Sequence, residues 1–275
     1  MYQLRPPSPP LRPWIEHYWF VTDDDGPVNL RVDAFVDARA DLVFNFGAPY
    51  TREVIGGAAV EHSASNLDAQ RLVPIRIHQA GHVRTTGVRF HLGGLAPFTR
   101  VALRSFTGTT APPAAVFGPG AAALEPALGT ADIDAQAAML DAFFLERLDP
   151  EPSAAWTRAL TCATTRSDAT GAELALAAGC SIRQVERLFA RHLGVAPKQL
   201  ARVLRFQRAL RHLMHDPVAV LSDVAHAAGY FDHAHFIRDF RRFTGGVPRG
   251  YRGYYPTPGP ADFAPNVVVF VQDTR

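Results

Sequence analysis

Two stretches near the C-terminal end of this 275-residue chain repeat one another. The triplet Ala177-Ala178-Gly179 recurs as Ala227-Ala228-Gly229, and Gly194-x-x-Pro197 recurs as Gly245-x-x-Pro248. The offset grows from 50 to 51 residues between the two, so one residue has been added in the turn while both flanking helical patterns survived. A helix of small residues, a glycine turn and a basic amphipathic helix describe a helix-turn-helix motif. Two in tandem predict contacts with two stretches of DNA.

Charge is distributed unevenly along the chain. Residues 1–152 contain 12 Lys/Arg and 17 Asp/Glu, a net of −5, whereas residues 153–253 contain 15 and 7, a net of +8. Almost all of the positive charge is arginine, whose planar guanidinium suits phosphate and guanine. The basic half therefore has the composition of a DNA-binding domain joined to a separate acidic module, with a merely solvated surface as the alternative interpretation.

Composition otherwise indicates an ordinary globular protein, with 47% hydrophobic and 20% charged residues. The sequence has no apolar run of the roughly 18 residues that a membrane span needs. Prolines occupy the N-terminal stretch where a signal peptide would have an apolar helix. Because only Cys162 and Cys180 occur, a disulfide framework is excluded and we expect a cytoplasmic protein.

The first 110 residues have the pattern of short strands, in which β-branched and aromatic residues alternate with turn residues. The predicted strands are Val28–Val36, Asp41–Phe46, Arg71–His78 and Val83–His91. Helical spacing follows at Leu95–Ser105, Ala121–Leu128 and Ile133–Leu148. This half is therefore predicted to be a β-sandwich or small barrel with a helical appendage.

Nearly everything after residue 153 has helical periodicity, which makes the whole chain an α+β protein. We expect helices at Ala154–Cys162, Gly171–Ala178, Ser181–His192, Lys198–His215, Leu221–Ala228, Asp232–Phe243 and Pro248–Tyr254. The predicted domains are 1–150, a β-rich sensor or dimerisation domain, and 153–254, an all-α DNA-binding domain. In the tail, 255–275, the β-run Val267–Val271 is placed against the N-terminal sheet as a working hypothesis.

The helix that follows each glycine turn is the predicted recognition helix, because its apolar side chains fall on one face and its polar ones on the other. For the first copy the predicted DNA-contacting residues are Ser181, Arg183, Gln184, Glu186, Arg187 and Arg191. For the second they are His233, Ala234, Ile237, Arg238, Arg241 and Arg242. Arg183 and Arg187 lie one turn apart, so both are expected to reach base edges. Arg191, Arg241 and Arg242 are expected on phosphates.

The C-terminal half resembles the DNA-binding domain of the AraC/XylS family of bacterial transcription regulators. The resemblance rests on three segments: Arg183 to Phe189 (RQVERLF) with Gly194-x-x-Pro197, Arg205 to Leu210 (RFQRAL), and Val224 to Arg252 with its second Gly-x-x-Pro. It implies two helix-turn-helix units about one DNA turn apart, joined by the long helix and entering successive major grooves. His233, Ala234 and Ile237 depart from the polar base-reading residues common in the family, which predicts weaker base reading by the second unit.

The N-terminal half is similar, over shorter segments, to the sensor-like domain of one branch of these regulators. The segments are Leu11 to Trp19 (LRPWIEHYW), Asp41 to Gly47 (DLVFNFG) and Gly87 to Phe98 (GVRFHLGGLAPF). The likeness implies a cupin-like β-barrel that binds a small effector or mediates dimerisation. We predict an effector pocket lined by the aromatic residues Trp14, Tyr18, Trp19, Phe44 and Phe46. Ordinary core packing is the alternative interpretation of these residues.

An enzymatic interpretation is the main competitor. Histidines that would suit a metal-dependent cupin-like enzyme are present, namely His17, His62, His78, His82 and His91. Their spacing does not form a metal-binding motif, and no hydrolase or phosphate-loop motif occurs, so we expect no metal, no cofactor and no catalysis. Cys162 and Cys180 lack the context of the reactive cysteines in DNA-alkylation repair regulators and are expected to pack as small buried side chains.

The resulting hypothesis is a sequence-specific DNA-binding transcription regulator. Its expected partners are double-stranded promoter DNA, a small effector, a second copy of the chain and, if it activates, RNA polymerase. A constitutive DNA-binding module without a ligand is the third alternative.

Overall fold

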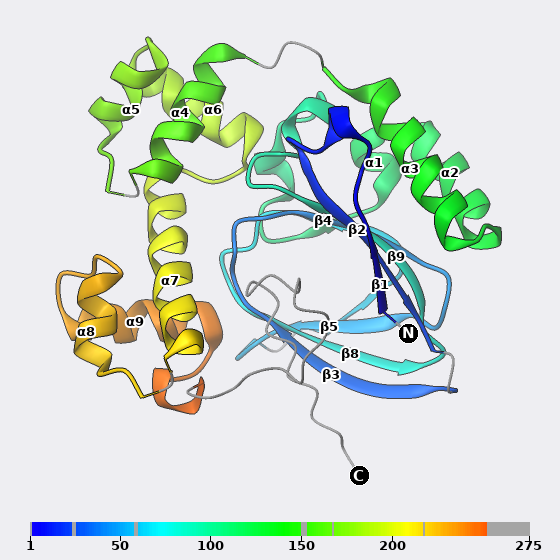
Figure 1. Ribbon diagram of the computed structural model, residues 1–275, viewed down its shortest axis with the longest axis horizontal. Coiled ribbons are helices and arrows are strands. Elements are labelled where there is room, and N and C mark those ends of the chain that lie inside the picture. Colours follow the sequence, from blue (N-terminus) through cyan, green and yellow to red (C-terminus); the bar gives the residue numbers. More distant parts are fainter. Residues whose placement is uncertain are drawn as a thin grey trace.

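The computed structural model describes residues 2–23, 26–57, 60–149, 153–166, 168–216 and 218–251. The tail, 255–275, with its predicted return of Val267–Val271, lies outside these ranges, as do residues 150–152 of the predicted linker. A β-rich part and a helical part lie side by side, with the long helix α7 (Pro197–His215) nearest the middle of the helical part (Figure 1).

The β-rich part consists of two separate antiparallel sheets within the described residues. The six-stranded sheet has the order β1 (Tyr2–Arg5), β2 (Ile15–Thr22), β9 (Arg84–Phe90), β4 (Asp41–Asn45), β7 (Asn66–Asp68) and β10 (Thr110–Ala111). The four-stranded sheet has the order β3 (Val28–Ala34), β8 (Ile75–Gly81), β5 (Tyr50–Val54) and β6 (Val60–Ser63). The sheets do not close on each other there, so the predicted barrel or sandwich is a sandwich.

The predicted strands correspond to β3, β4, β8 and β9, but one of them, β8, begins four residues later than predicted. The run Arg71–His78 becomes a strand only from Ile75, because Pro74 has no N–H to donate to a neighbouring strand. The remaining strands are short or interrupted, and β2 carries a register irregularity between Ile15 and His17. Such segments lack the sustained alternation on which strand prediction depends.

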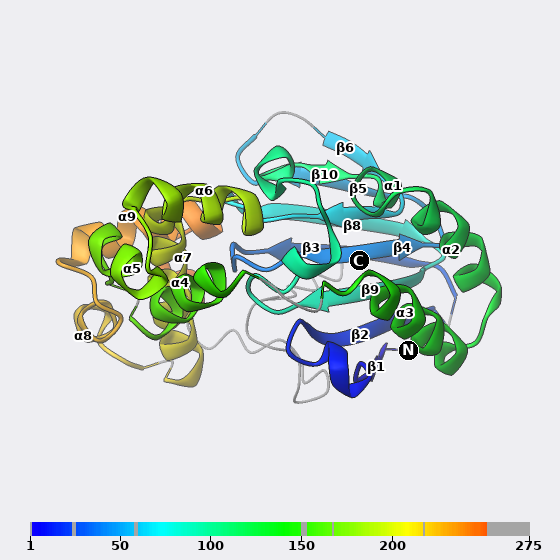
Figure 2. The same ribbon diagram turned by 90° about the horizontal axis from the view of Figure 1, so that it is seen from above.

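Three helices cover the outer face of the six-stranded sheet, as Figures 1 and 2 show: α1 (Pro113–Phe117), α2 (Pro119–Thr130) and α3 (Ile133–Arg147). The sheet buries Tyr18, Phe44 and Phe90 against this layer, and the ring of Phe90 lies 5.6 Å from that of Phe144. This core holds the helical appendage on the sandwich.

The predicted helix Leu95–Ser105 is wrong. Two short 3-10 helices occur instead, η2 (Ala96–Phe98) and η3 (Leu103–Phe106). Thr99 leaves the helical conformation with φ −141° and ψ 145°, and its hydroxyl donates to the carbonyl of Val116 at 3.0 Å. Val116 lies in α1, so this side-chain bond fixes Thr99 in its extended conformation against α1, where the helix cannot continue.

The helical part follows the predicted elements within a few residues. It contains α4 (Ala154–Thr165), α5 (Gly171–Ala178), α6 (Ile182–His192), α7, α8 (Leu221–Ala227), α9 (His233–Thr244) and η4 (Pro248–Tyr251). The predicted first residues of the two recognition helices are their N-caps: the side chain of Ser181 accepts from the N–H of Gln184, and that of Asp232 accepts from His235.

The repeat is longer than the two motifs from which it was recognised. Arg158-Ala159-Leu160 of α4 recurs as Arg208-Ala209-Leu210 of α7, at the same offset of 50 residues. Arg158 donates to the carbonyl of Ala178 and Arg208 to that of Ala228, both at 2.8 Å. Each arginine thus satisfies a free carbonyl at the end of the following helix. The repeated unit is therefore three helices, with the second half of α7 serving as the first helix of the second copy.

Candidate DNA-binding interface

The recognition helices α6 and α9 are held by aromatic packing on their inner faces. The ring of Phe189 in α6 meets Trp156 of α4 edge-on at 5.2 Å, and the ring of Phe240 in α9 meets Phe206 of α7 at 5.6 Å. Trp156 and Phe206 are equivalent in the repeat. The same internal anchor therefore fixes the rotation of both helices, and so selects the face that each exposes.

In the first unit, all six predicted contact residues are exposed. Ser181 and Gln184 form a reciprocal capping box, in which Gln184 Oε1 accepts from the Ser181 N–H at 2.8 Å. They therefore define the start of the helix, while Arg183, Glu186 and Arg187 extend from its free face.

In the second unit, five of the six predicted residues are exposed, namely His233, Ala234, Arg238, Arg241 and Arg242. Ile237 is half-buried and packs against the helical core. The carboxylate of Asp239 is only 1% exposed and pairs with Arg202 of α7, which ties the buried side of α9 to the long helix. Fewer polar groups face outward here than in α6.

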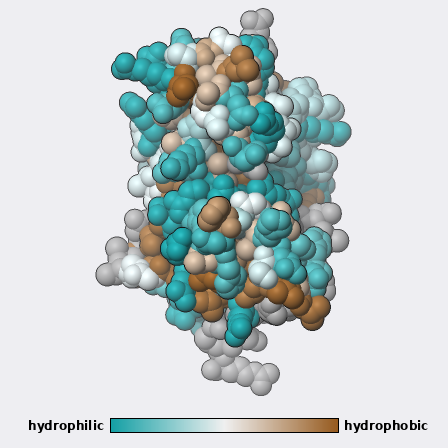
Figure 3. Space-filling model, turned by 90° about the vertical axis from the view of Figure 1, so that its left-hand side faces the viewer, coloured by the Kyte–Doolittle hydropathy of each residue, from teal (hydrophilic) through white to brown (hydrophobic). Residues whose placement is uncertain are grey.

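The two recognition helices lie along the same side of the helical part in the view of Figure 2. Figure 3 shows the end of the molecule formed by the helical part, where hydrophilic side chains predominate and hydrophobic ones occur in isolated patches. An arginine-rich surface of this kind suits phosphate binding, which dominates the affinity of proteins for DNA.

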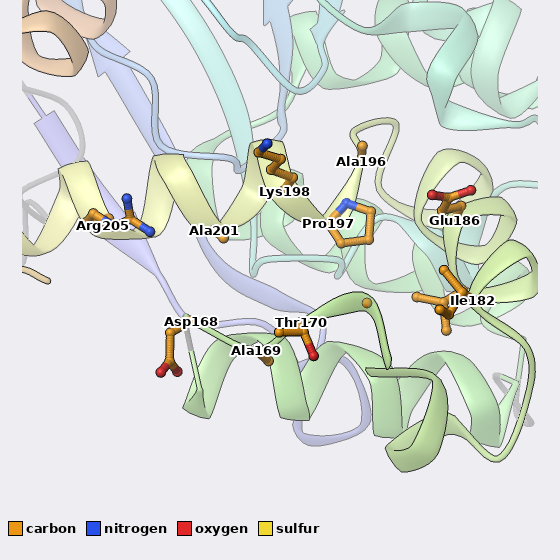
Figure 4. A pocket seen from close by; sticks show the side chains of 12 residues that line it. Asp168, Ala169, Thr170, Ile182, Glu186, Ala196, Pro197, Lys198, Ala201 and Arg205 are labelled. Atoms are coloured by element: carbon orange, nitrogen blue, oxygen red, sulfur yellow. The ribbon is translucent and has the colours of Figure 1, made fainter. Parts of the chain in front are cut away.

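A hollow of about 370 Å³ lies between the loop before α5, the start of α6 and the first half of α7 (Figure 4). Ile182 and Glu186 line it from α6, Lys198 and Arg205 from α7, and Asp168 from the loop. Acidic and basic side chains face one another across this hollow, so it does not form a site for a single class of charged ligand.

The structure identifies one exposed residue that the sequence prediction missed. Since Ser181 and Asp232 are both N-caps, and Cys180 corresponds to Tyr230, the residue added to the second copy is Phe231. Its side chain is 94% exposed, and it immediately precedes Asp232, the N-cap of the second recognition helix. The change of offset from 50 to 51 was the available signal, because an insertion in a turn carries its own side chain to the surface.

The five predicted pocket residues do not line one cavity. Tyr18 and Phe44 are fully buried beneath α3, where the Tyr18 hydroxyl donates to Asp141 at 2.8 Å, and Trp14 and Phe46 pack against the same core. Burial and this hydrogen bond raise the pKa of Tyr18. Trp19 lies on the opposite face of β2, because neighbouring residues of a strand point to opposite sides. The aromatic pattern of this segment therefore mostly reflects core packing.

A buried group of charges occupies the space between the two sheets. Arg52 of β5 bonds to Asp68 of β7 at 3.1 Å, and Asp68 also pairs with Arg71. Arg89 of β9 pairs with both Asp37 and Asp41. These residues are scattered in the sequence, so the network could not be recognised before the strands were paired.

The histidines are dispersed. His78 contacts Asn29 at 2.6 Å and His82 contacts Asp23 at 2.7 Å, while burial lowers the pKa of His17 and of His91, which both lie near Glu16. The side chain of His62 lies outside the described residues. Within the described ranges, no three His, Cys, Asp or Glu side chains are grouped as metal ligands. Cys162 and Cys180 are half-buried free thiols, packed against the helical core.

Comparison with known proteins adds two family matches. Residues 174–254 match a helix-turn-helix domain, and residues 3–112 match a domain of unknown function, DUF6597. No curated protein matches the sequence significantly. Among the described residues, no helix is long and apolar enough to span a membrane.

Several solved structures are similar. ToxT from Vibrio cholerae is 9% identical, with 84% of this chain and 97% of that chain covered and a TM-score of 0.45. An AraC-type regulator from Chromobacterium violaceum is 27% identical, with 38% and 95% covered and a TM-score of 0.35. A DNA-binding transcriptional dual regulator from Escherichia coli K-12 is 26% identical, with 38% and 92% covered and a TM-score of 0.33.

Two capped recognition helices joined by a long helix define a DNA-binding protein with a double helix-turn-helix. The matched helix-turn-helix family covers both units. The chain therefore carries an AraC-type helix-turn-helix domain at its C-terminal end, and it is a DNA-binding transcription regulator with a β-rich N-terminal region.

Proposed function

We propose that α6 and α9 enter successive major grooves of one DNA duplex, as two recognition helices of different character. The observation that carries this proposal is that both helices are capped, anchored by equivalent aromatic contacts and exposed along one side of the helical part. The same proposal divides the chain into two functional domains, residues 1–150 and residues 153–254.

The first unit supplies most of the base recognition. Arg183 and Arg187 each carry the paired donors that suit guanine, and Glu186 between them suits the amino group of cytosine. Arg191, at the end of α6, contacts phosphate. This unit therefore favours a G·C-containing block.

The second unit contributes less direct base reading and more anchoring. Arg238 is its main candidate for guanine, while Ala234 offers only a methyl group and Ile237 is half-buried. Arg241 and Arg242 contact phosphates, and His233 lies at the first turn. Phe231 packs on a deoxyribose or a thymine methyl group beside the start of α9, because its exposed ring adjoins an arginine-rich DNA-facing surface.

The N-terminal domain acts as the regulatory part, through a small effector or a second copy of the chain, and has no catalytic role. Trp19 is the member of the predicted aromatic pocket that faces the space between the sheets, and is the residue proposed to contact an effector. Tight stoichiometric metal in the purified protein would favour the enzyme instead. A ligand screen by thermal shift that finds no stabilising compound would favour the constitutive module. A regulator of this kind acts in the cytoplasm, and an activating one contacts RNA polymerase.

Selection of bound fragments from genomic DNA with the purified full chain tests the proposed binding mode. We expect recovered sites to contain two short blocks about one helical turn apart, which is about 10 base pairs. The block bound by α6 should be the better defined of the two. Recovery of a single block, or of no sequence preference, would contradict the proposal.

A further inference from the structure

The two copies of the repeat contact the β-rich part at equivalent positions. Gly194 follows α6 and Gly245 follows α9, with positive φ angles of 86° and 78°. They are the same position in the repeat. Each also lies directly against the N-terminal part, and no periodicity in the sequence predicts this.

At the first copy, the carbonyl of Gly194 accepts a hydrogen bond from Thr107 Oγ1 at 2.7 Å. A Cβ atom at Gly194 would lie only 3.0 Å from the Leu103 carbonyl oxygen. At the second copy, a Cβ atom at Gly245 would lie 2.5 Å from Ile55 Cγ2, closer than real Cβ contacts allow. The C-terminal end of each recognition helix is thus seated on the β-rich part, and its N-terminal end points away.

A third contact holds the helix that joins the two copies. Gln207 of α7 is buried and donates from Nε2 to the carbonyl of Val36 at 2.5 Å. Phe35 and Val36 are fully buried in the same cluster as the helical core, and the Phe35 ring meets Tyr251 edge-on at 5.4 Å. The N-terminal part therefore contacts the first copy, the joining helix and the second copy.

We propose that the N-terminal part, through these three contacts, sets the separation of the two DNA blocks to which the protein binds. This inference rests on the proposed insertion of α6 and α9 into successive grooves. One base pair inserted between the blocks moves the second by about 3.4 Å and turns it by about 35°. The contact between the β-rich part and the C-terminal end of each recognition helix opposes both movements. The single helix α7, by contrast, could bend or twist to follow them.

The test measures the affinity of the full chain for DNA in which the spacing between the two selected blocks is changed by one or two base pairs. For the wild-type protein we expect one preferred spacing, with at least about tenfold weaker binding one base pair away, the scale of a mismatch in a specific site. Thr107→Val removes the hydrogen bond to Gly194, and Gly245→Ala forces α9 from Ile55. Each should reduce that discrimination to about threefold or less, or move the preferred spacing.

The repeat offers matched controls. Gly229 has a φ of 86°, and a Cβ atom there would approach only the Arg208 guanidinium, at 3.5 Å. Gly229→Ala therefore imposes the same backbone strain as Gly245→Ala without displacing the β-rich part, and should keep the wild-type spacing preference. Ile55→Ala removes the atom that Gly245→Ala strikes, so the double variant should recover that preference in part. Circular dichroism identifies variants that fail to fold.

The outcomes distinguish failure of two-groove binding from failure of the proposed control of spacing. If the wild-type protein itself ignores the spacing, two-groove binding is wrong. If it has a sharp preference that Thr107→Val and Gly245→Ala both retain, the joining helix alone sets the separation and our inference is overturned.

Discussion

At the scale of single residues, the two recognition helices differ in the side chains that they expose. Arg183, Glu186 and Arg187 are exposed on α6 with groups that distinguish bases. On α9, Ala234 and Arg238 are exposed beside the added Phe231. Substitutions should therefore divide into those that alter sequence preference and those that alter only affinity.

Arg187→Ala should weaken binding to the selected site by about 1–3 kcal/mol and relax the preference at one or two base pairs. Arg241→Ala should instead weaken binding to all sequences and reduce the slope of log affinity against log salt by about 1. Binding titrations on specific and scrambled duplexes at several salt concentrations distinguish these effects. If Arg187→Ala changed neither affinity nor preference, the assigned face of α6 would be wrong.

Phe231→Ala should lower affinity by about 1 kcal/mol without changing the salt dependence, because an apolar contact releases no counterions. Its exposure predicts almost no loss of folding stability. Val218→Ala is a matched control, since this side chain is also mostly exposed, at 84%, but lies before α8. If the wild-type protein, Phe231→Ala and Val218→Ala bound DNA with equal affinity, Phe231 would not belong to the interface.

At the scale of elements, the repeated three-helix unit explains why the recognition helices are presented alike. Arg158 and Arg208 donate hydrogen bonds to the equivalent carbonyl in each copy. Trp156 and Phe206 likewise make the equivalent aromatic contact with the recognition helix. The copies differ beneath α9, where Asp239 is buried and α7 supplies its cation. The second copy thus depends on an ion pair for which the first shows no equivalent among its described contacts.

Arg202→Ala should destabilise the protein by about 1–3 kcal/mol, because it leaves the Asp239 carboxylate buried without its strongest partner. Partial exposure of Arg202 keeps the expected loss below the roughly 3–5 kcal/mol of a fully buried pair. Denaturant unfolding measures the change. Arg202→Ala combined with Asp239→Leu should recover part of the loss; no recovery would indicate that Arg202 acts through packing alone.

At the scale of the whole molecule, one of the two hydrophobic clusters joins the β-rich part to the helical part. Phe35 and Val36, between β3 and β4, are fully buried among residues of α7, α9 and η4. Packing of this kind couples the stability of the two parts, although they were predicted as separate domains. It also makes the N-terminal part a structural support for the DNA-binding helices, beyond any regulatory role.

Phe35→Ala should lower stability by about 3–5 kcal/mol, through lost burial and the cavity left behind. Hydrogen exchange should then accelerate in α7 and α9 as well as in β3 and β4, because one cluster joins them. Phe44→Ala, in the core beneath α3, is the matched control and should accelerate exchange mainly within the β-rich part. Acceleration confined to β3 and β4 in Phe35→Ala would show that the parts are stabilised independently.

The sequence by itself determined the helical part almost completely. The local signals in this part are the helix periodicity, the caps at Ser181 and Asp232, and the glycine turns. Because the sequence is duplicated, each signal occurs in both copies. The outward faces of α6 and α9 follow from that periodicity. Tertiary structure alone decided which strands pair, why Tyr18 and Phe44 are core rather than pocket, and where the β-rich part holds the repeat. The bond from Gln207 to Val36 joins residues 171 positions apart. Contacts at such separation depend on the packing of complete elements, and no local pattern encodes them.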